Sequence, residues 1–161
     1  MANFYIAEGP DGAGKTTLIE QLTAAHPGCH VQHFGKPESA EEAENYWKTY
    51  LRFIKRYEEK ETVIFDRCWY SDMVYGPVMR NTQEMTNEKM EILELAVKAC
   101  GGGIIIYCTG KLEVLWKRCM YRGENYITNK DMLKAICAKY DEVMNLPKYI
   151  PVVRYDTTVK W

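Results

Sequence analysis

The residues with the clearest chemistry lie near the start of the chain. Residues 9–16 read GPDGAGKT and fit the pattern G-x-x-x-x-G-K-[ST], directly behind a short apolar run. Glycines let such a loop wrap a phosphate closely, and the helix that follows adds a partial positive charge at its N-terminus. Lys15 can then reach the outer phosphates, and the Thr16 hydroxyl can ligate Mg²⁺. The sequence therefore predicts a nucleoside triphosphate site. The residues expected to contact the triphosphate are Gly9, Pro10, Asp11, Gly12, Ala13, Gly14, Lys15, Thr16 and Thr17.

A second charged pair, Asp66 and Arg67, directly follows the apolar run at residues 62–65. Parallel sheets bind ligands at the rim formed by the carboxyl ends of their strands. A charged pair at the end of a buried strand is therefore expected at that rim. The alternative is an ion pair that only closes the strand.

The elements that must position these residues alternate along the chain. Clear signals mark where helices begin and end: a His-Pro-Gly sequence at residues 26–28, a capping box from Ser39 to Glu42, and three glycines at residues 101–103. We expect strands at residues 4–7, 29–34, 62–65, 104–108 and 152–155, and helices at residues 15–25, 39–57, 68–79, 87–98, 112–120 and about 128–146. This alternation predicts one α/β domain over residues 1–161, with three layers and a five-stranded parallel sheet, as in P-loop NTPases.

Composition narrows the function classes. The chain has 161 residues and a formal net charge of −1, which argues against a basic surface built for nucleic acid. No apolar run approaches the roughly 20 residues of a membrane span, and no signal peptide precedes the first strand. The six cysteines form no C-x-x-C pair, and no histidine or cysteine spacing suits zinc. We expect a cytoplasmic protein with reduced thiols and small-molecule partners, and with no partner membrane or nucleic acid.

The predicted helix at residues 39–57 is rich in aromatic residues at helical spacing. Core packing explains most of them. Phe53 is a candidate to stack on a nucleobase, and the face over residues 43–57 could form a homodimer contact. Arg52 and Arg56 are interpreted as solvated surface charges, and phosphate contact is the alternative for each.

Two motifs together resemble the thymidylate kinases. Residues 8–17, EGPDGAGKTT, are similar to the opening of that family, and residues 66–75, DRCWYSDMVY, are similar to its second motif. Arg122-Gly123-Glu124 resembles the start of the family's lid, which we place at about residues 118–128. The resemblance covers most of the chain, and the shortened build looks like a viral or phage member of the wider thymidylate and deoxynucleoside kinase group.

The resemblance implies a role for several of these residues. Asp66, with Thr16, would hold Mg²⁺, and Arg67 would grip the acceptor phosphate. Asp11 would contact the acceptor sugar, and Tyr75 would line the nucleoside pocket. The full set expected to bind the acceptor is Asp11, Lys36, Glu38, Phe53, Arg67, Trp69 and Tyr75.

The lid would supply further cations. Position 12 is Gly, where one branch of the family carries an arginine on the transferred phosphate. The resemblance therefore implies that lid arginines do this work, and Arg118 and Arg122 are the candidates. With Lys15 and Arg67 they form the expected catalytic set.

The expected activity is an Mg²⁺-dependent transfer of the ATP γ-phosphoryl group to a deoxynucleoside monophosphate, with dTMP as the expected acceptor. A first alternative is a deoxynucleoside kinase that phosphorylates the 5′-hydroxyl of thymidine or another deoxynucleoside. That reaction needs a carboxylate base, for which Glu38 is the candidate, whereas Lys36 suits a phosphate. A second alternative is a regulatory module that binds nucleotide without an acceptor. The chain departs from the family at residues 33–37, at Cys68 and at Gly76, which leaves base preference open.

Overall fold

The computed structural model describes residues 3–57, 61–123 and 126–159. Its sheet has five parallel strands in the order β2-β3-β1-β4-β5. The strands are β1 (Asn3–Glu8), β2 (His30–His33), β3 (Thr62–Asp66), β4 (Gly103–Thr109) and β5 (Val152–Asp156). This architecture confirms the predicted fold class.

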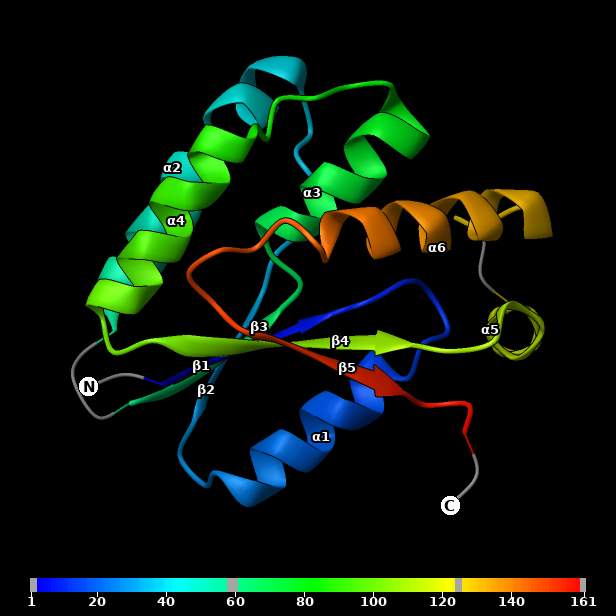
Figure 1. Cartoon of the computed structure of the whole chain (residues 1–161), viewed down its shortest axis with the longest axis horizontal. Coiled ribbons are helices and arrows are strands. Elements are labelled where there is room, and N and C mark those ends of the chain that lie inside the picture. The colour runs from blue at the N-terminus through cyan, green and yellow to red at the C-terminus, as the bar shows by residue number, and fades with distance from the viewer. Residues whose placement is uncertain (1–2, 58–60, 124–125, 160–161) are drawn as a thin grey trace.

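Helices cover both faces of the sheet. They are α1 (Lys15–Ala25), α2 (Ala40–Arg56), α3 (Trp69–Tyr75), α4 (Asn87–Ala99), α5 (Leu112–Arg122) and α6 (Lys130–Val143). Figure 1 shows α1 on one face and α2, α3, α4 and α6 on the other, with α5 beyond the carboxyl end of β4. The expected lid overlaps residues 124–125, which lie outside the described residues.

The predicted helix at residues 68–79 is broken in the structure. The α-helix ends at Tyr75, and a single wider turn, η1 (Gly76–Arg80), follows it. Pro77 has no N–H to donate to the carbonyl one α-turn before it, so the regular ladder cannot continue through this position. The turn ends at Asn81, which adopts a positive φ of 52°.

Strand direction and order determine where the loops meet. From β1 the chain crosses to one side to form β2 and β3, then returns to the other side to form β4 and β5. The parallel register sets Ala7 beside Asp66 and His33 beside Asp66 from the other side. The loops after β1, β2 and β3 therefore gather at one edge of the sheet, at the point where the strand order reverses.

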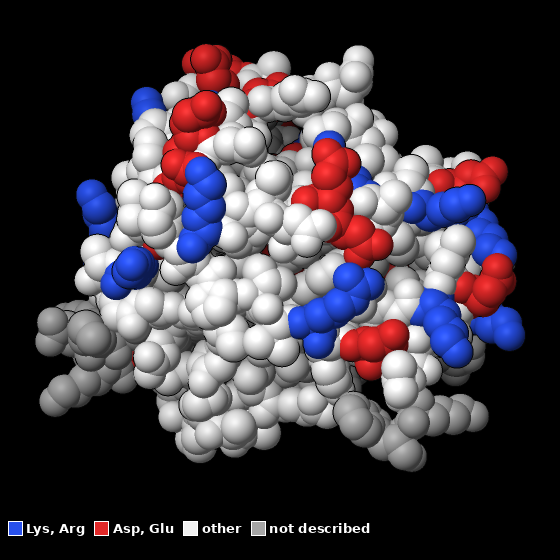
Figure 2. Space-filling view, viewed as in Figure 1, with Lys and Arg blue, Asp and Glu red and all other residues white. Residues whose placement is uncertain are grey.

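Charged groups of both signs are interspersed over the face viewed in Figure 2. None of the described helices is long and apolar enough to cross a bilayer.

Glu94 on α4 is a fully buried carboxylate with all its partners in place. It accepts hydrogen bonds from the Tyr70 hydroxyl at 2.8 Å and from the backbone N–H groups of Lys148 and Tyr149 at 2.9 and 2.8 Å. It therefore fastens the segment that joins α6 to β5. On the same helix, Glu91 reaches the side chain of Lys148 in a much more exposed ion pair.

We expect Glu94→Ala to lower the free energy of unfolding by about 3 kcal/mol, because three donors lose a buried acceptor. Glu91→Ala is the matched control, and its loss should be much smaller because the Lys148 pair is solvent-screened. Urea unfolding of both variants measures the difference. Equal losses would show that the buried contacts of Glu94 do not stabilise the segment.

Candidate active site

The loop after β1 has the backbone of a phosphate cradle. Gly9, Gly12 and Gly14 adopt φ values of 155°, 80° and 83°. A residue with a side chain would be strained in these backbone conformations. The loop also packs too tightly for a side chain. A Cβ on Gly9 would lie 2.3 Å from the carbonyl oxygen of Cys108, and one on Gly12 would lie 2.6 Å from that of Leu115. The glycines at these positions are therefore required by geometry.

A hollow of about 180 Å³ lies over this loop. Its lining residues are Pro10, Asp11, Gly12, Ala13, Gly14, Lys15, Thr16, Arg67 and Arg122. Three cations therefore reach one small space beside the N-terminus of α1. Such an arrangement suits the phosphates of a nucleotide.

Asp66, at the end of β3, lies between two basic side chains. Lys15 donates a hydrogen bond to one carboxylate oxygen, and the Nδ1 atom of His33 contacts the other. Burial alone would raise the pKa of Asp66, but the hydrogen bond and charge of Lys15, and then those of His33, outweigh it and lower the pKa. The carboxylate is thus ionised near neutral pH. His33 carries no role in the sequence predictions, although its place at the end of a neighbouring parallel strand is a usable signal.

Arg67 adopts a positive φ of 63°, which is rare for a residue with a side chain. Its Nη1 atom donates to the Gly9 carbonyl at 2.9 Å and to the Tyr140 hydroxyl at 2.7 Å. Its guanidinium also lies 5.2 Å from the ring centroid of Tyr75 and 3.8 Å from a carboxylate oxygen of Asp11. Burial alone would lower the pKa of Arg67, but the surrounding phenol and carboxylate oxygens raise it, so the group stays charged.

A buried carboxylate, Glu8, supports Arg67 from behind. Glu8 accepts hydrogen bonds from the backbone N–H of Cys68 at 2.8 Å and of Ser71 at 3.2 Å, at the start of α3. It also accepts from the Ser71 hydroxyl at 2.7 Å and the Tyr140 hydroxyl at 2.9 Å. Arg67 donates to Tyr140, which also binds Glu8. This arginine is therefore held by three elements: the end of β1, the start of α3 and the middle of α6.

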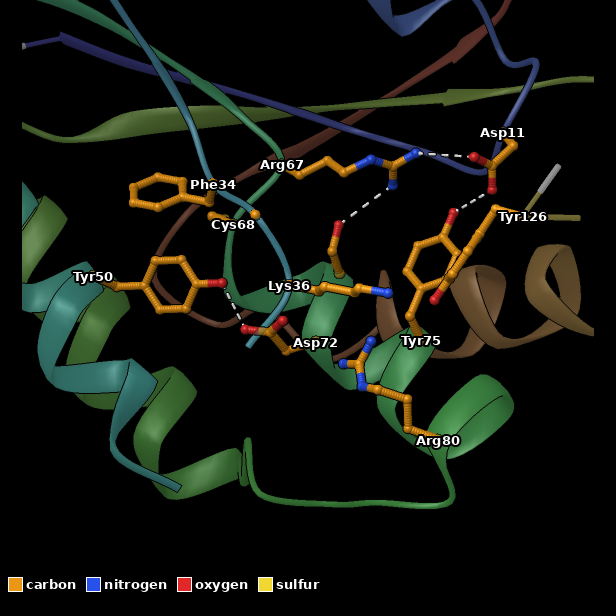
Figure 3. Close-up of a pocket in the computed structure, with 12 residues that line it drawn as sticks. Asp11, Phe34, Lys36, Tyr50, Arg67, Cys68, Asp72, Tyr75, Arg80 and Tyr126 are labelled. Carbon is orange, nitrogen blue, oxygen red and sulfur yellow. Dashed lines mark hydrogen bonds and ion pairs between the residues drawn. The ribbon is translucent and has the colours of Figure 1, made fainter. Parts of the chain in front are cut away.

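A second and larger cavity, of about 320 Å³, opens beside Arg67 (Figure 3). Its lining residues are Asp11, Phe34, Gly35, Lys36, Tyr50, Arg67, Cys68, Ser71, Asp72, Tyr75, Arg80 and Tyr126. Figure 3 shows Arg67 and Asp11 at one end and Asp72 and Arg80 at the other, with Lys36 between them. The rings of Phe34 and Tyr50 lie on one side, and those of Tyr75 and Tyr126 lie on the other. This size and this mixture of aromatic walls with a few polar groups are typical of a small-molecule site.

The two ends of the cavity carry different polar groups. At the end next to the phosphate loop, Tyr75 donates to Asp11 at 2.7 Å. At the far end, Tyr50 donates to Asp72 at 2.6 Å, and burial raises the pKa of Asp72 to about 7 despite this hydrogen bond and the nearby Arg80. The far end therefore holds a carboxyl group that titrates near neutral pH.

The structure brings most of the predicted site residues to these two hollows. Those that line one or both are Asp11, Lys15, Thr16, Lys36, Arg67, Tyr75 and Arg122, with the remaining loop residues from Pro10 to Gly14. Asp66 contacts Lys15 directly behind them.

Besides Asp66, six of the predicted residues line neither hollow. Gly9 and Thr17 flank the lining stretch from Pro10 to Thr16, and the other four lie elsewhere. Phe53 packs behind Phe34, with ring centroids 5.4 Å apart, and Phe34 itself faces the cavity. Trp69 is fully buried in the core. Glu38 is exposed at the start of α2, where its N–H donates to Glu42. Arg118 lies behind the phosphate loop rather than over it. Their roles in substrate contact stay predictions without support from this geometry.

Several residues that line the larger cavity carry no role in the sequence predictions: Phe34, Tyr50, Asp72, Arg80 and Tyr126. Phe34 follows the end of β2, so its position at the carboxyl edge was available from the pattern. The others depend on how α2, α3 and η1 pack, which no local spacing reveals.

The raised pKa of Asp72 predicts a pH-dependent stability. Between about pH 4, where an unfolded carboxyl titrates, and about pH 7, the folded chain binds more protons at this site than the unfolded chain. The contribution of Asp72 to the free energy of unfolding should therefore fall as pH rises, by at most about 1.4 kcal/mol per pH unit. Asp72→Asn lacks the titrating group. Urea unfolding of both proteins from pH 4.5 to 8 should show their difference changing up to about pH 7 and then levelling, and a constant difference would contradict the assignment.

The sequence that carries these two loops matches a known family. Residues 4–106 match the family model described as Polyphosphate kinase 2 (PPK2). The match spans well over half of the chain, and it includes both the loop at residues 9–16 and the pair Asp66 and Arg67.

One relative is similar over nearly the whole chain. The SPbeta prophage-derived uncharacterized protein YorR of Bacillus subtilis strain 168 is 30% identical over 142 residues, which is 87% of this chain and 81% of that protein. A crystal structure of YorR from Bacillus subtilis in complex with phosphorylated GDP has a TM-score of 0.78 and 24% identity, covering 98% of this chain and 86% of that one.

Two further structures share the fold. Polyphosphate kinase 2 from Arthrobacter aurescens TC1 has a TM-score of 0.69 and 17% identity, covering 95% of this chain, which spans 60% of that protein's length. Deoxyadenosine kinase from M. mycoides, with products dCMP and a flexible dCDP bound, has a TM-score of 0.58 and 19% identity, covering 96% of this chain and 89% of that one. The predicted P-loop kinase fold is thereby confirmed, while the narrower resemblance to thymidylate kinases stays a prediction. By the match of its first two thirds, the chain belongs to the polyphosphate kinase 2 family.

Proposed function

We propose that this chain is an Mg²⁺-dependent kinase that transfers the γ-phosphoryl group of ATP to a nucleoside monophosphate. One observation carries the proposal: Asp11 and Arg67 line both the hollow over the phosphate loop and the larger cavity. A donor phosphate on the loop and an acceptor phosphate at the near end of the cavity would therefore both lie beside Arg67. Two phosphates that must react need such a shared cation.

The reaction itself requires little of the protein beyond position and charge. An oxygen of the acceptor phosphate forms a bond to the γ-phosphorus, and the bond from that phosphorus to the β–γ bridging oxygen breaks, which releases ADP. Lys15 and the loop amides would hold the donor. Arg67 would orient the acceptor, and Arg122, which lines the loop hollow, would offset charge on the transferred group.

The donor set of the site fits Mg²⁺. The Thr16 hydroxyl and the Asp66 carboxylate are hard oxygen ligands, and Mg²⁺ is usually held by one or two protein oxygens together with substrate phosphates and water. Among the described residues, no cluster of three or more His, Cys, Asp and Glu side chains could hold a metal without the substrate. The cation would neutralise charge on the β and γ oxygens of the donor.

The cavity supports a monophosphate acceptor over a nucleoside hydroxyl. A phosphate ester is already ionised near pH 7, so it needs cations rather than a base. Lys36 lines the cavity, 5.4 Å from the ring centroid of Tyr126, whereas Glu38, the candidate base, does not line it. The two carboxylates that do line it, Asp11 and Asp72, each accept a hydrogen bond from a tyrosine. The resemblance to thymidylate kinases points to dTMP as the acceptor. YorR, whose structure holds phosphorylated GDP, points to a guanine nucleotide.

Family membership favours one second candidate, in which polyphosphate replaces ATP as the donor. The PPK2 match includes the whole phosphate loop. A loop that cradles consecutive phosphates suits both the triphosphate of ATP and a polyphosphate. The acceptor side of the proposal is unchanged in this case. A module that only binds nucleotide has no use for the second cavity.

The proposal is tested by pairing each donor with each acceptor. ATP and polyphosphate are incubated with dTMP, dGMP, GMP, thymidine and deoxyguanosine in Mg²⁺, and the products are separated by chromatography. We expect diphosphates from at least one monophosphate, at rates far above those for the nucleosides. Turnover of nucleosides alone would assign the chain to the deoxynucleoside kinases, and no turnover of any pair would refute the kinase proposal.

In the active pair, we expect Lys15→Ala to lower kcat/KM by at least about a hundredfold, because the lysine contacts charge that grows in the transition state. Circular dichroism should show an intact fold. A folded Lys15→Ala protein with near-normal turnover would contradict the role of the loop.

Arg67→Ala should raise the KM for the acceptor more than the KM for the donor, because Lys15 and the loop amides would still hold the donor phosphates. Arg52→Ala, on the exposed side of α2, is the matched control and should change neither value. Equal increases for donor and acceptor would show that Arg67 does not distinguish them.

A further inference from the structure

Two residues from the second half of the chain hold the phosphate loop from outside. The Nη1 atom of Arg118 donates to the carbonyl of Gly12 at 3.1 Å and to the Thr157 hydroxyl at 2.8 Å, and its Nη2 atom donates to the Thr157 carbonyl at 3.0 Å. The Thr157 hydroxyl in turn donates to the carbonyl of Ala13 at 2.8 Å. Thr157 directly follows β5, and its N–H donates to Thr109 at 3.0 Å. Two consecutive loop carbonyls are therefore held by one small network.

Holding a carbonyl also orients an amide. Every described peptide bond is trans, so the C=O and the N–H of one peptide unit point in opposite directions. The hydrogen bond from Thr157 turns the carbonyl of Ala13 outward, and the N–H of Gly14 must then point to the other side. The Ala13 N–H, which shares its peptide unit with the Gly12 carbonyl, donates within the loop to Pro10 at 3.2 Å. The outer contacts thus direct the Gly14 N–H toward the hollow over the loop.

We propose that Arg118 and Thr157 are positioning residues that keep the phosphate loop in its phosphate-binding shape. The inference rests on the proposed role of the loop as the donor site. It gives Arg118 a different task from that of a lid arginine. Its guanidinium is engaged by Gly12 and Thr157, and it does not line the hollow, whereas Arg122, one helical turn further along α5, does.

The same contacts explain how Arg122 is placed. Arg118 fastens α5 to the back of the loop, and residues four apart lie on one face of a helix. The helix ends at Gly123, which adopts a positive φ of 70°. Arg122 therefore projects from a fixed helix end rather than from a free segment.

The contacts make a quantitative prediction about phosphate binding. A loop without them would have to be ordered by the ligand, and this ordering would weaken binding. Because the effect concerns the loop alone, it should be equal for any ligand that places phosphates there. The acceptor cavity should be unaffected, since neither Arg118 nor Thr157 lines it.

The experiment titrates the full chain with ATP and separately with inorganic tripolyphosphate, by calorimetry, so that it does not depend on turnover. Thr157→Val keeps the side-chain shape but removes the hydroxyl, and Thr157→Ser restores it. We expect Thr157→Val to raise the Kd of both ligands about tenfold, and Thr157→Ser to stay within about twofold of the wild type. Arg118→Ala should resemble Thr157→Val, and the double variant should lose much less than the product of the two single effects, because the residues share one network.

Thr158→Val is the matched control. Thr158 is the next residue and binds Asp156 and the Lys111 N–H, without a hydrogen bond to the loop. It should leave both Kd values unchanged. The unfolding midpoint of each variant is measured as well. A variant that binds phosphate weakly only because it is less stable would show a lowered midpoint.

Two results would overturn the inference. One is unchanged affinity of Thr157→Val for both ligands. The other is an Arg118→Ala protein that binds ATP normally but has a reduced kcat, which would assign Arg118 to the transition state instead. A third result separates the two proposals. If the wild-type chain turns over no donor and acceptor pair, but Thr157→Val still weakens phosphate binding, the proposed function is refuted and the positioning role is supported.

Discussion

The arrangement of the site depends on the Glu8 carboxylate, buried at the end of the central strand. Its four hydrogen bonds come from the first turn of α3 and from Tyr140 on α6. A buried carboxylate left without partners would be strongly destabilising, so these elements can pack in few other ways. Because Arg67 lies between the strand end and α3 and donates to Tyr140, the same contacts hold it in an unfavourable backbone conformation. Arg67 is therefore held by three elements that lie far apart in the sequence.

The order of the strands places the hollow over the phosphate loop next to the larger cavity. β1 and β3 are neighbours, so the phosphate loop and the Asp66-Arg67 pair emerge side by side. β2 lies on the far side of β3, and its following residues, including Phe34 and Lys36, close the larger cavity. Nothing in this arrangement requires a long loop or a second domain. A small chain can present both spaces together because one parallel edge of the sheet supplies the residues of each.

The fold and the phosphate side of the site were predictable from the sequence, and the acceptor side was so only in part. Strand and helix periodicity gave all five strands, and the glycine-lysine spacing identified the loop because its chemistry is local. The choice of Phe53 over Phe34 shows the limit. Both are aromatic and near the same edge, and only the packing of α2 on the sheet decides which ring faces the cavity. Tyr140 and Thr157 lie more than 60 residues from the groups they position, so no motif contains them.

The contact between Lys15 and Asp66 has a consequence for selectivity among the small ions of the cell. Each of these groups is the other's counterion in the structure. A free phosphate that captured Lys15 would leave Asp66 with only His33 opposite it, and a free cation that captured Asp66 would leave Lys15 unmatched. A complex that brings an anion and a cation together satisfies both groups at once. If the proposed function holds, this mutual neutralisation would favour a paired phosphate and cation over either ion alone.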